Sequence, residues 1–338
     1  MAAQRMLTEE EIPAYLRGLG LAVPGEPIAV ARVGDGNINW VRRVVVGGER
    51  GRSFVLKQAR PALERFPQYS APTERLLFEA RWFELARPHD TGAICPRVLA
   101  LDDANRVLVL EDLSAAERLD AALARAADVW PQMEALARFL ARVHAATAGD
   151  DTLPAQFEND AMRRLHGDHI FVLPYQANDF GLTPRIDAAA RDARADAALV
   201  RAASEAHAHY SSPRGALVHA DVQAGNLLLL ANGDVKLLDA EIAHVGDAAF
   251  DLGTLLAHLA LPFVARGEDA SALLARVRSA YRSERSCAAE LVARAQRHAG
   301  FELIRRTIGA ARVAAVASDE AGLRVLARGR AWALGRSD

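Results

Sequence analysis

The chain has few cysteines and no large excess of either charge. Cys95 and Cys287 are its only two cysteines, they lie far apart, and neither is part of a C-x-x-C motif. This pattern excludes a disulfide framework and a zinc site built on paired cysteines. The 41 Lys and Arg residues nearly balance the 43 Asp and Glu residues, which gives a formal net charge of -2. Nucleic-acid binding requires a basic field, so we expect no nucleic-acid partner.

Segments that would direct the chain to a membrane are also missing from the sequence pattern. Residues 1–10 lack the apolar region of a signal peptide. We find no apolar stretch of roughly 18 residues, the length that a membrane-spanning helix needs. The sequence therefore predicts a cytoplasmic protein with reduced cysteines and no membrane partner.

The composition is that of an ordinary globular protein. Of the 338 residues, 51% are hydrophobic and 25% are charged, which is enough apolar material for independent folding. A chain of this length exceeds what one hydrophobic core usually organises. Two lobes are therefore expected.

The first third of the chain is typical of a small antiparallel β lobe. After a leading helix over residues 8–20, short β-branched segments separated by glycine-rich turns predict strands. A helix is expected over residues 73–86, where apolar positions recur at helical spacing. The strands are expected at 28–33, 39–46, 53–58, 97–101 and 106–110. Residues 1–113 are therefore predicted to form an N-terminal lobe.

The remainder, residues 114–338, has the Ala- and Leu-rich periodicity of a mainly helical lobe. Its helical pattern is interrupted between about residues 217 and 239, where two short strands are expected around an Ala-Asn-Gly-Asp turn. A β insert in a helical lobe is a natural place for a functional site. The clearest helical stretches are 117–126, 131–147, 186–208, 269–299 and 301–335.

The strongest chemical pattern lies in this β insert. Residues 218–226 read V-H-A-D-V-Q-A-G-N, and residues 237–241 read L-L-D-A-E. Phosphoryl transfer requires a carboxylate at the attacking hydroxyl and oxygen ligands for Mg²⁺. Asp221 is the candidate catalytic base or orienting group, although turn and cap positions are an alternative explanation for single aspartates. The candidate Mg²⁺ ligands are Asn226, Asp239 and Glu241.

A second pattern, in the N-terminal lobe, is typical of a site for the phosphates of ATP. A glycine-rich turn lets backbone N–H groups approach phosphates, and a lysine on a neighbouring strand neutralises them. Lys57 lies in an apolar strand and should be paired, with Glu79 as the first candidate partner and Glu84 as the second. A plain hairpin turn is the alternative. The candidate loop residues are Gly34, Asp35, Gly36, Asn37 and Asn39.

The spacing in residues 219–241 resembles the H-G-D-x-x-x-x-N and D-x-E motifs of the aminoglycoside phosphotransferase and choline kinase superfamily. The resemblance implies a bilobal, protein-kinase-like α+β fold that uses ATP and Mg²⁺. It also implies that backbone groups of the connector between the lobes read the adenine edge. Here these are the carbonyl of Glu111 and the N–H of Leu113, within E-D-L-S. Ala220 stands where the superfamily has glycine.

Within that superfamily the chain most resembles the methylthioribose kinases. Residues 34–39 (G-D-G-N-I-N) are similar to that family's G-D-G-N-L-N loop, and residues 57–59 (K-Q-A) and 111–114 (E-D-L-S) match its motifs. The catalytic loop H-A-D-V-Q-A-G-N departs from the family's H-G-D-L-H-T-G-S. A homodimer is implied by this resemblance alone.

The prediction of a sugar-binding site depends on residues 304–309. They resemble the segment of methylthioribose kinases in which a pair of arginines contacts the sugar. Arg305 and Arg306 are the candidate sugar-binding residues here, and a solvated helix face is the alternative. Neighbouring residues on a regular helix point about 100° apart, so at most one of the two is expected to reach the site. Tyr69 is the nearest counterpart of the tryptophan in the family's sugar-covering loop.

The expected function is transfer of a phosphoryl group from ATP to a sugar hydroxyl. The resemblance favours the anomeric 1-OH of S-methyl-5-thioribose or a related deoxypentose. Two alternatives remain open: a kinase for another small hydroxyl substrate, such as an aminoglycoside, choline, homoserine or another sugar, and an inactive nucleotide-binding module. A polycationic aminoglycoside is disfavoured because the C-terminal helices show no acidic cluster.

Overall fold

The structure, a computed structural model, describes residues 4–33, 39–48, 51–62, 71–286 and 289–336. It divides into two compact units. Residues 1–88 and 95–116 form the N-terminal unit, and residues 89–94 and 117–338 form the C-terminal unit. Each unit is described by itself below.

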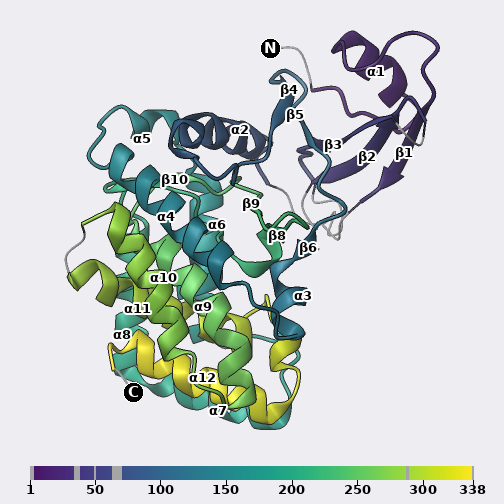
Figure 1. Cartoon of the computed structure of the whole chain (residues 1–338). Coiled ribbons are helices and arrows are strands. Elements are labelled where there is room, and N and C mark those ends of the chain that lie inside the picture. Colours follow the sequence, from purple (N-terminus) through teal and green to yellow (C-terminus); the bar gives the residue numbers. More distant parts are fainter. Residues whose placement is uncertain (1–3, 34–38, 49–50, 63–70, 287–288, 337–338) are drawn as a thin grey trace. The chain divides into compact units, whose positions relative to one another are not determined.

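The N-terminal unit contains a five-stranded antiparallel sheet in the order β1-β2-β3-β5-β4. Leu16 of the short helix α1 packs with Trp40, Val44 and Leu56 of β2 and β3 in a buried core. Helix α2 contacts β4 and β5 (Figure 1). The elements are α1 (Ile12–Gly18), β1 (Ile28–Arg32), β2 (Trp40–Val46), β3 (Arg52–Gln58), α2 (Arg75–Ala86), β4 (Val98–Asp102) and β5 (Val107–Glu111).

The C-terminal unit is mainly helical. Helices α9, α11 and α12 pack on one another, and α10 packs on α4 (Figure 1). Its helices are α3 (Leu119–Ala124), α4 (Trp130–Thr147), α5 (Leu153–Gln156), α6 (Asp160–Phe171), α7 (Pro184–Ala195), α8 (Ala197–Tyr210), α9 (Ala249–Arg266), α10 (Ser271–Glu284), α11 (Ala289–Ile308) and α12 (Asp319–Ala333).

Two small antiparallel sheets interrupt these helices. Strand β7 (Ala216–Val218) pairs with β10 (His244–Gly246), and β8 (Leu227–Leu229) pairs with both β6 (Glu117–Arg118) and β9 (Val235–Leu237). The hairpin β8–β9 confirms the two strands expected around the Asn-Gly turn. The loop between β7 and β8 and the segment after β9 carry the catalytic pattern.

Three predicted helices are divided in the structure. The stretch 186–208 breaks at Asp196, whose carboxylate accepts hydrogen bonds from the N–H groups of Ala198 and Leu199 and so caps α8. The stretch 269–299 is shared between α10 and α11, and the stretch 301–335 between α11 and α12. The spacing of hydrophobic residues can continue across a helix break, because it carries no information on the hydrogen bonds that cap a helix.

Helix α9 corrects the expectation that no apolar segment of membrane-spanning length occurs. Its 18 residues are long and apolar enough to cross a membrane by length and composition, but 83% of that window is buried inside the protein. A helix that is apolar all round is typical of the centre of a core. Packing against α11 and α12 therefore accounts for the composition of α9.

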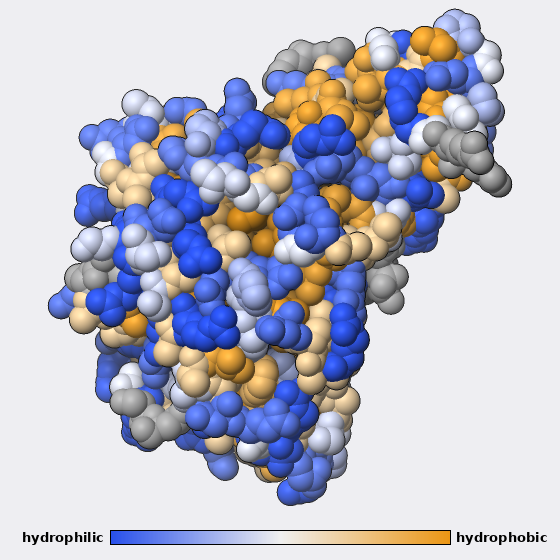
Figure 2. Space-filling view, in the orientation of Figure 1, coloured by the Kyte–Doolittle hydropathy of each residue, from blue (hydrophilic) through white to orange (hydrophobic). Residues whose placement is uncertain are grey.

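On the face shown in Figure 2, hydrophilic and hydrophobic side chains are mixed over the C-terminal unit. Large hydrophobic side chains that are exposed are scattered over both units, and two of them, Leu99 and Leu101, lie on the edge strand β4. Single exposed hydrophobic residues are normal on a globular protein. They indicate no particular partner.

Candidate active site

A buried ion pair joins β3 to α2 in the N-terminal unit. Nζ of Lys57 lies 2.7 Å from Oε2 of Glu79, and their side chains are only 6% and 1% exposed. Lys57 reaches this position because β3 is an interior strand between β2 and β5. The first of the two expected partners is thus present, while Glu84 is exposed on the far part of α2. A buried ammonium needs such a partner to stay charged.

Most of the predicted glycine-rich loop, Gly34 to Asn37, lies outside the described residues, and so does Tyr69. Asn39 is described and is buried. Its Oδ1 accepts hydrogen bonds from Nε and Nη2 of Arg75, at 3.1 and 2.8 Å. The sequence did not reveal this link, which ties the end of the loop to the start of α2.

The segment after β5 is shaped by Asp112. Its carboxylate accepts from Nε of Arg43 at 2.6 Å and from the backbone N–H of Ser114 at 2.9 Å. Glu111 at the end of β5 binds Arg97 through its side chain, with Oε1 accepting from the backbone N–H at 3.0 Å. The side chains of Glu111 and Asp112 are thus occupied locally. Recognition of an adenine edge by the carbonyl of Glu111 and the N–H of Leu113 stays a prediction.

In the C-terminal unit, Asp251 in the first turn of α9 anchors the loop that contains Asp221. Its two carboxylate oxygens accept the backbone N–H groups of His219 and Ala220, each at 2.8 Å, and Oδ2 lies 3.0 Å from Nε2 of His144. Burial alone would raise the pKa of Asp251. The hydrogen bond and the charge of His144 lower it by more than burial raises it, so the pKa of Asp251 lies below the ordinary range. An ionised Asp251 therefore fixes the loop backbone.

Two residues of the site adopt left-handed backbone conformations that favour glycine. Ala220 has φ of 66° and Asp239 has φ of 63°. For a residue with a Cβ atom this conformation costs about 1 kcal/mol or more. The glycine of the superfamily motif would avoid that cost, and here the two bonds from Asp251 to the loop hold Ala220 in place. Strained residues of this kind are common at active sites.

Asp221 lies in the centre of this loop. Its Oδ2 accepts from Nδ2 of Asn226 at 2.7 Å and from Nε2 of Gln223 at 3.2 Å. Burial of the surroundings raises the pKa of the Asp221 carboxyl from 3.8 to about 6, although the charges of Arg305 and Arg306 lower it. The side chain still keeps partial access to solvent. A carboxyl with a pKa near neutrality can accept the proton of a hydroxyl.

The predicted Mg²⁺ ligands are brought close to one another by the β8–β9 hairpin. Asn226 directly precedes β8, and its carbonyl accepts from the N–H of Leu238 at 2.9 Å, next to Asp239. Because Nδ2 of Asn226 points to Asp221, its amide oxygen is directed away from that carboxylate. One carboxylate and one amide oxygen suit Mg²⁺, which keeps several waters and phosphate oxygens.

Glu241 is the third predicted Mg²⁺ ligand. The residue is only 7% exposed, and its backbone carbonyl accepts from Nδ2 of Asn159 at 2.9 Å. Within the described residues there is no group of three or more His, Cys, Asp or Glu that could hold an ion. Such a group is not required for Mg²⁺, for which Asn226, Asp239 and Glu241 remain predicted ligands.

Arg305 and Arg306 on α11 belong to a buried polar network rather than to a solvated face. Glu302 accepts from Nε of Arg306 at 2.6 Å and from Nη1 of Arg305 at 3.2 Å, and His258 lies 3.1 Å from it. Burial raises the pKa of Glu302, but the two guanidinium charges hold it well below the ordinary range. Nη1 of Arg305 also lies 3.1 Å from Nε2 of His166.

Only one arginine of the pair reaches the catalytic loop by a direct hydrogen bond among the described contacts. Nη2 of Arg306 donates to Oε1 of Gln223 at 2.8 Å. This fits the expectation that adjacent helical residues diverge. Sequence reasoning assigned no role to Asp251, Glu302 or Gln223, although Gln223 lies within the catalytic pattern 218–226. The available signal was a carboxylate among apolar neighbours, at Asp251 in the mostly apolar α9 and at Glu302 between Phe301 and Leu303.

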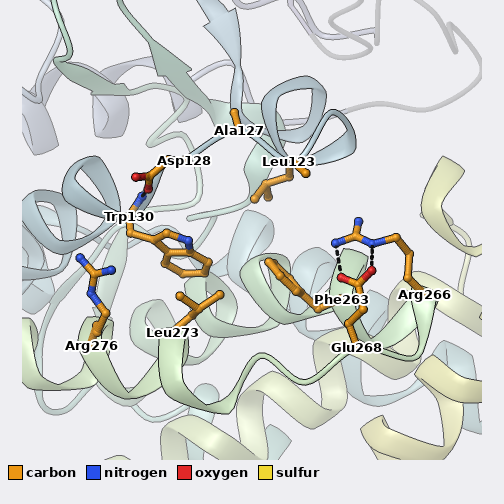
Figure 3. Close-up of a pocket in the computed structure, with 10 residues that line it drawn as sticks. Leu123, Ala127, Asp128, Trp130, Phe263, Arg266, Glu268, Leu273 and Arg276 are labelled. Atoms are coloured by element: carbon orange, nitrogen blue, oxygen red, sulfur yellow. Dashed lines mark hydrogen bonds and ion pairs between the residues drawn. The ribbon is translucent and has the colours of Figure 1, made fainter.

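A cavity of about 390 Å³ lies elsewhere in the C-terminal unit, between α3, α4, α9 and α10 (Figure 3). The ring of Trp130 lies 6.1 Å from that of Phe263, and Arg266 is paired with Glu268 at its rim. None of the residues that line it belongs to the catalytic loop or the arginine pair. It is therefore separate from the candidate active site.

The chain belongs to the phosphotransferase enzyme family, which matches residues 29–291. It is thus a phosphotransferase that acts on a hydroxyl group. A methylthioribose kinase from Pectobacterium carotovorum subsp. carotovorum is 30% identical over 390 residues, and the alignment covers 100% of this chain and 94% of the relative. The family predicted from the motifs is confirmed.

Solved structures support the same fold class. The aminoglycoside phosphotransferase from Alicyclobacillus acidocaldarius has a TM-score of 0.54 and 17% identity, over 99% of this chain and 94% of that chain. Spectinomycin phosphotransferase bound to ADP and spectinomycin has a TM-score of 0.55 and 11% identity, over 98% and 100%. The predicted fold, an antiparallel sheet unit followed by a helical unit, is confirmed.

Proposed function

We propose that this enzyme transfers the γ-phosphoryl group of ATP to a sugar hydroxyl, and specifically to the anomeric 1-OH of S-methyl-5-thioribose or a related deoxypentose. The observation that carries the proposal is the hydrogen-bonded line Arg306–Gln223–Asp221. It joins a guanidinium, which provides fixed donors for sugar oxygens, to the carboxylate that would accept the proton of the attacking hydroxyl.

Each unit carries groups that suit part of ATP. Lys57, kept in place by Glu79, suits the α and β phosphates, and the backbone of residues 111–113 suits the adenine edge. Mg²⁺ bound by Asp239 and Asn226 would neutralise charge on the phosphate oxygens. Asp221 would orient the acceptor hydroxyl. The relative's name and the bound ADP of the spectinomycin enzyme support this assignment.

A cationic acceptor fits the site less well. The guanidinium groups of Arg305 and Arg306 lie close enough to Asp221 to lower its pKa, and Glu302 is shared between the two of them. A cationic amine on the acceptor would therefore be repelled by the two arginines. The carboxylate of Glu302 would not attract it, because the arginines already neutralise that charge. This favours a neutral sugar over an aminoglycoside or choline.

The test is ATP consumption at pH 8 with a panel of acceptors: methylthioribose, ribose, deoxyribose, choline, homoserine and kanamycin. We expect turnover with one of the pentoses and background with the cations, and a rate at least about 10²-fold lower in Asp221→Asn protein. Turnover with choline or kanamycin alone would overturn the sugar assignment. No turnover with any acceptor would favour the inactive nucleotide-binding module.

Replacement of Lys57 by Met is expected to raise KM for ATP and lower kcat together, because the phosphates lose their cation. Glu79→Gln should have the same effect more mildly through loss of lysine orientation. The double variant should lose less of kcat/KM for ATP than the two single losses combined, because the two residues act together. Initial rates measured at varied ATP concentration give these losses. Glu84→Gln is the matched control on the same helix, and strict additivity would disprove the coupling.

Arg306→Lys is expected to lower kcat/KM for the acceptor by roughly tenfold, about 1.4 kcal/mol, while KM for ATP stays constant. Lysine keeps the charge but loses the planar fork that binds Gln223 and Glu302 together. Arg305→Lys should have a smaller effect, because its described partners are Glu302 and His166. If both variants behave like the wild type toward every accepted sugar, the arginine pair does not hold the acceptor.

A further inference from the structure

Gln223 is the residue through which α11 reaches the catalytic loop in the C-terminal unit. Its Oε1 accepts from Nη2 of Arg306 at 2.8 Å, and its Nε2 donates to Oδ2 of Asp221 at 3.2 Å. Gln223 and Arg306 are 83 residues apart in the chain. One amide therefore connects the group proposed to hold the acceptor with the group proposed to orient its hydroxyl.

The orientation of this amide follows from the chemistry of its two neighbours. A guanidinium carries only donors, and an ionised carboxylate carries only acceptors. The amide oxygen must therefore face Arg306, and the amide nitrogen must face Asp221. Rotation of the amide by half a turn would place donor against donor and acceptor against acceptor. The link is consequently directional and allows one arrangement.

The far side of the link is rigid as well. Nε of Arg306 donates to Glu302 at 2.6 Å, its Nη1 donates to the carbonyl of Ala311 at 3.3 Å, and its side chain is only 8% exposed. A guanidinium with three fixed contacts has little freedom to adjust. Arg306 therefore presents Nη2 from a fixed position, and the length and polarity of the side chain at 223 decide whether that group is connected to Asp221.

We propose that Gln223 is a positioning residue that fixes Arg306 relative to Asp221 and so favours a neutral, polyhydroxylated acceptor. This inference rests on the proposed function, because it takes Arg306 to hold the acceptor. Displacement of a reacting group by about 1 Å can cost about 10²-fold in rate, so the link is expected to affect turnover strongly. The methylthioribose kinase motif has a histidine at this position, and a neutral imidazole also offers one donor and one acceptor.

Four variants separate the two halves of the link. Gln223→Glu keeps an acceptor for Arg306 but has no donor for Asp221, and Gln223→Met is similar in size but has neither. Gln223→His keeps both a donor and an acceptor. Gln156→Met, on the exposed surface of α5, is the matched control. All are assayed with the acceptor that the panel identifies.

For Gln223→Met we expect kcat/KM for the acceptor to fall about 30-fold or more, with KM for ATP within about twofold. Gln223→Glu should keep KM for the acceptor within about threefold and lower kcat about tenfold, and Gln223→His should recover most of the activity. A general loss of folding would lower the active fraction without changing either KM. Wild-type kinetics in Gln223→Met, or equal losses in all three variants, would overturn the proposal.

A second measurement needs no acceptor. Thermal unfolding of Gln223→Met, Arg306→Lys and the double variant should show a combined loss in Tm clearly smaller than the sum, because both changes break the same contact. Gln156→Met with Arg306→Lys should be additive. Additive losses in the first cycle would disprove the link. If the losses in Tm are smaller than additive but the protein phosphorylates no sugar, the contact between Gln223 and Arg306 is supported and only the proposed function is overturned.

Discussion

Asp221→Asn should lower kcat about 10²- to 10⁴-fold while KM for ATP stays within a few-fold. The change keeps the shape of the side chain and removes the acceptor for the proton of the attacking hydroxyl. Asn226 and Gln223, which both donate to Oδ2, would then face an amide. Initial rates with ATP and the acceptor varied in turn at pH 8 measure the effect. A variant that retains most of its rate would remove Asp221 from the mechanism.

The same variant should be more stable than the wild type when no metal is present. Burial raises the pKa of Asp221 to about 6 in the folded protein, above its ordinary value of 3.8. The folded state therefore loses stability as the pH rises from about 4 to 6 and the carboxyl ionises. Asn does not ionise, so its Tm advantage should be largest above pH 6 and shrink toward pH 4.5. An advantage that does not depend on pH would contradict the assigned pKa.

Asp251→Asn should have the largest effect on folding of any single change at the site. The carboxylate accepts from His219, Ala220 and His144 in a fully buried position. An amide offers one oxygen and brings its own donor toward a backbone N–H. Removing one partner of a buried charge costs about 3 kcal/mol or more, roughly 10 °C in Tm for a unit of this size. Differential scanning fluorimetry measures it.

Activity should fall together with stability in Asp251→Asn, because the loop that carries Asp221 loses its anchor. Asp192→Asn, at an exposed position of α7, is the matched control and should change Tm by less than about 2 °C. A loop held mainly by the strand pairing of β7 and β10 would instead keep its conformation. If Asp251→Asn lowers Tm by no more than Asp192→Asn does, the pairing of β7 and β10 is what holds the loop.

Local pattern was sufficient for much of the fold. The strands of the N-terminal sheet and the hairpin β8–β9 were predicted within a residue or two, because alternation and turn residues are short-range signals. Helix α9 was missed because nearly all of its residues are apolar and buried, so it has too few polar residues to mark a solvent face. Helix breaks such as the one at Asp196 were missed because the caps depend on local hydrogen bonds.

The sequence by itself determined the chemical groups of the site. The order and spacing of Asp221, Asn226 and Asp239 around a hairpin, and of Lys57 in an apolar strand, are local features of the chain. They identify phosphoryl transfer because this reaction needs a carboxylate, oxygen ligands for a metal and a cation in those positions. The need of Lys57 for a carboxylate partner followed because a lysine in an apolar strand must be paired, and the structure selected Glu79 over Glu84.

Only the tertiary structure decided which residues hold these groups in place. Asp251 binds the loop, Glu302 holds both arginines, and Gln223 connects Arg306 to Asp221. The bond from Asp251 to His219 joins residues 32 positions apart, and the bond from Arg306 to Gln223 joins residues 83 positions apart on different elements. The bonds from Glu302 to the two arginines lie within helix α11. Whether a polar side chain inside an apolar helix is a buried anchor depends on what packs against it. That packing is set by the whole C-terminal unit rather than by any local stretch of sequence.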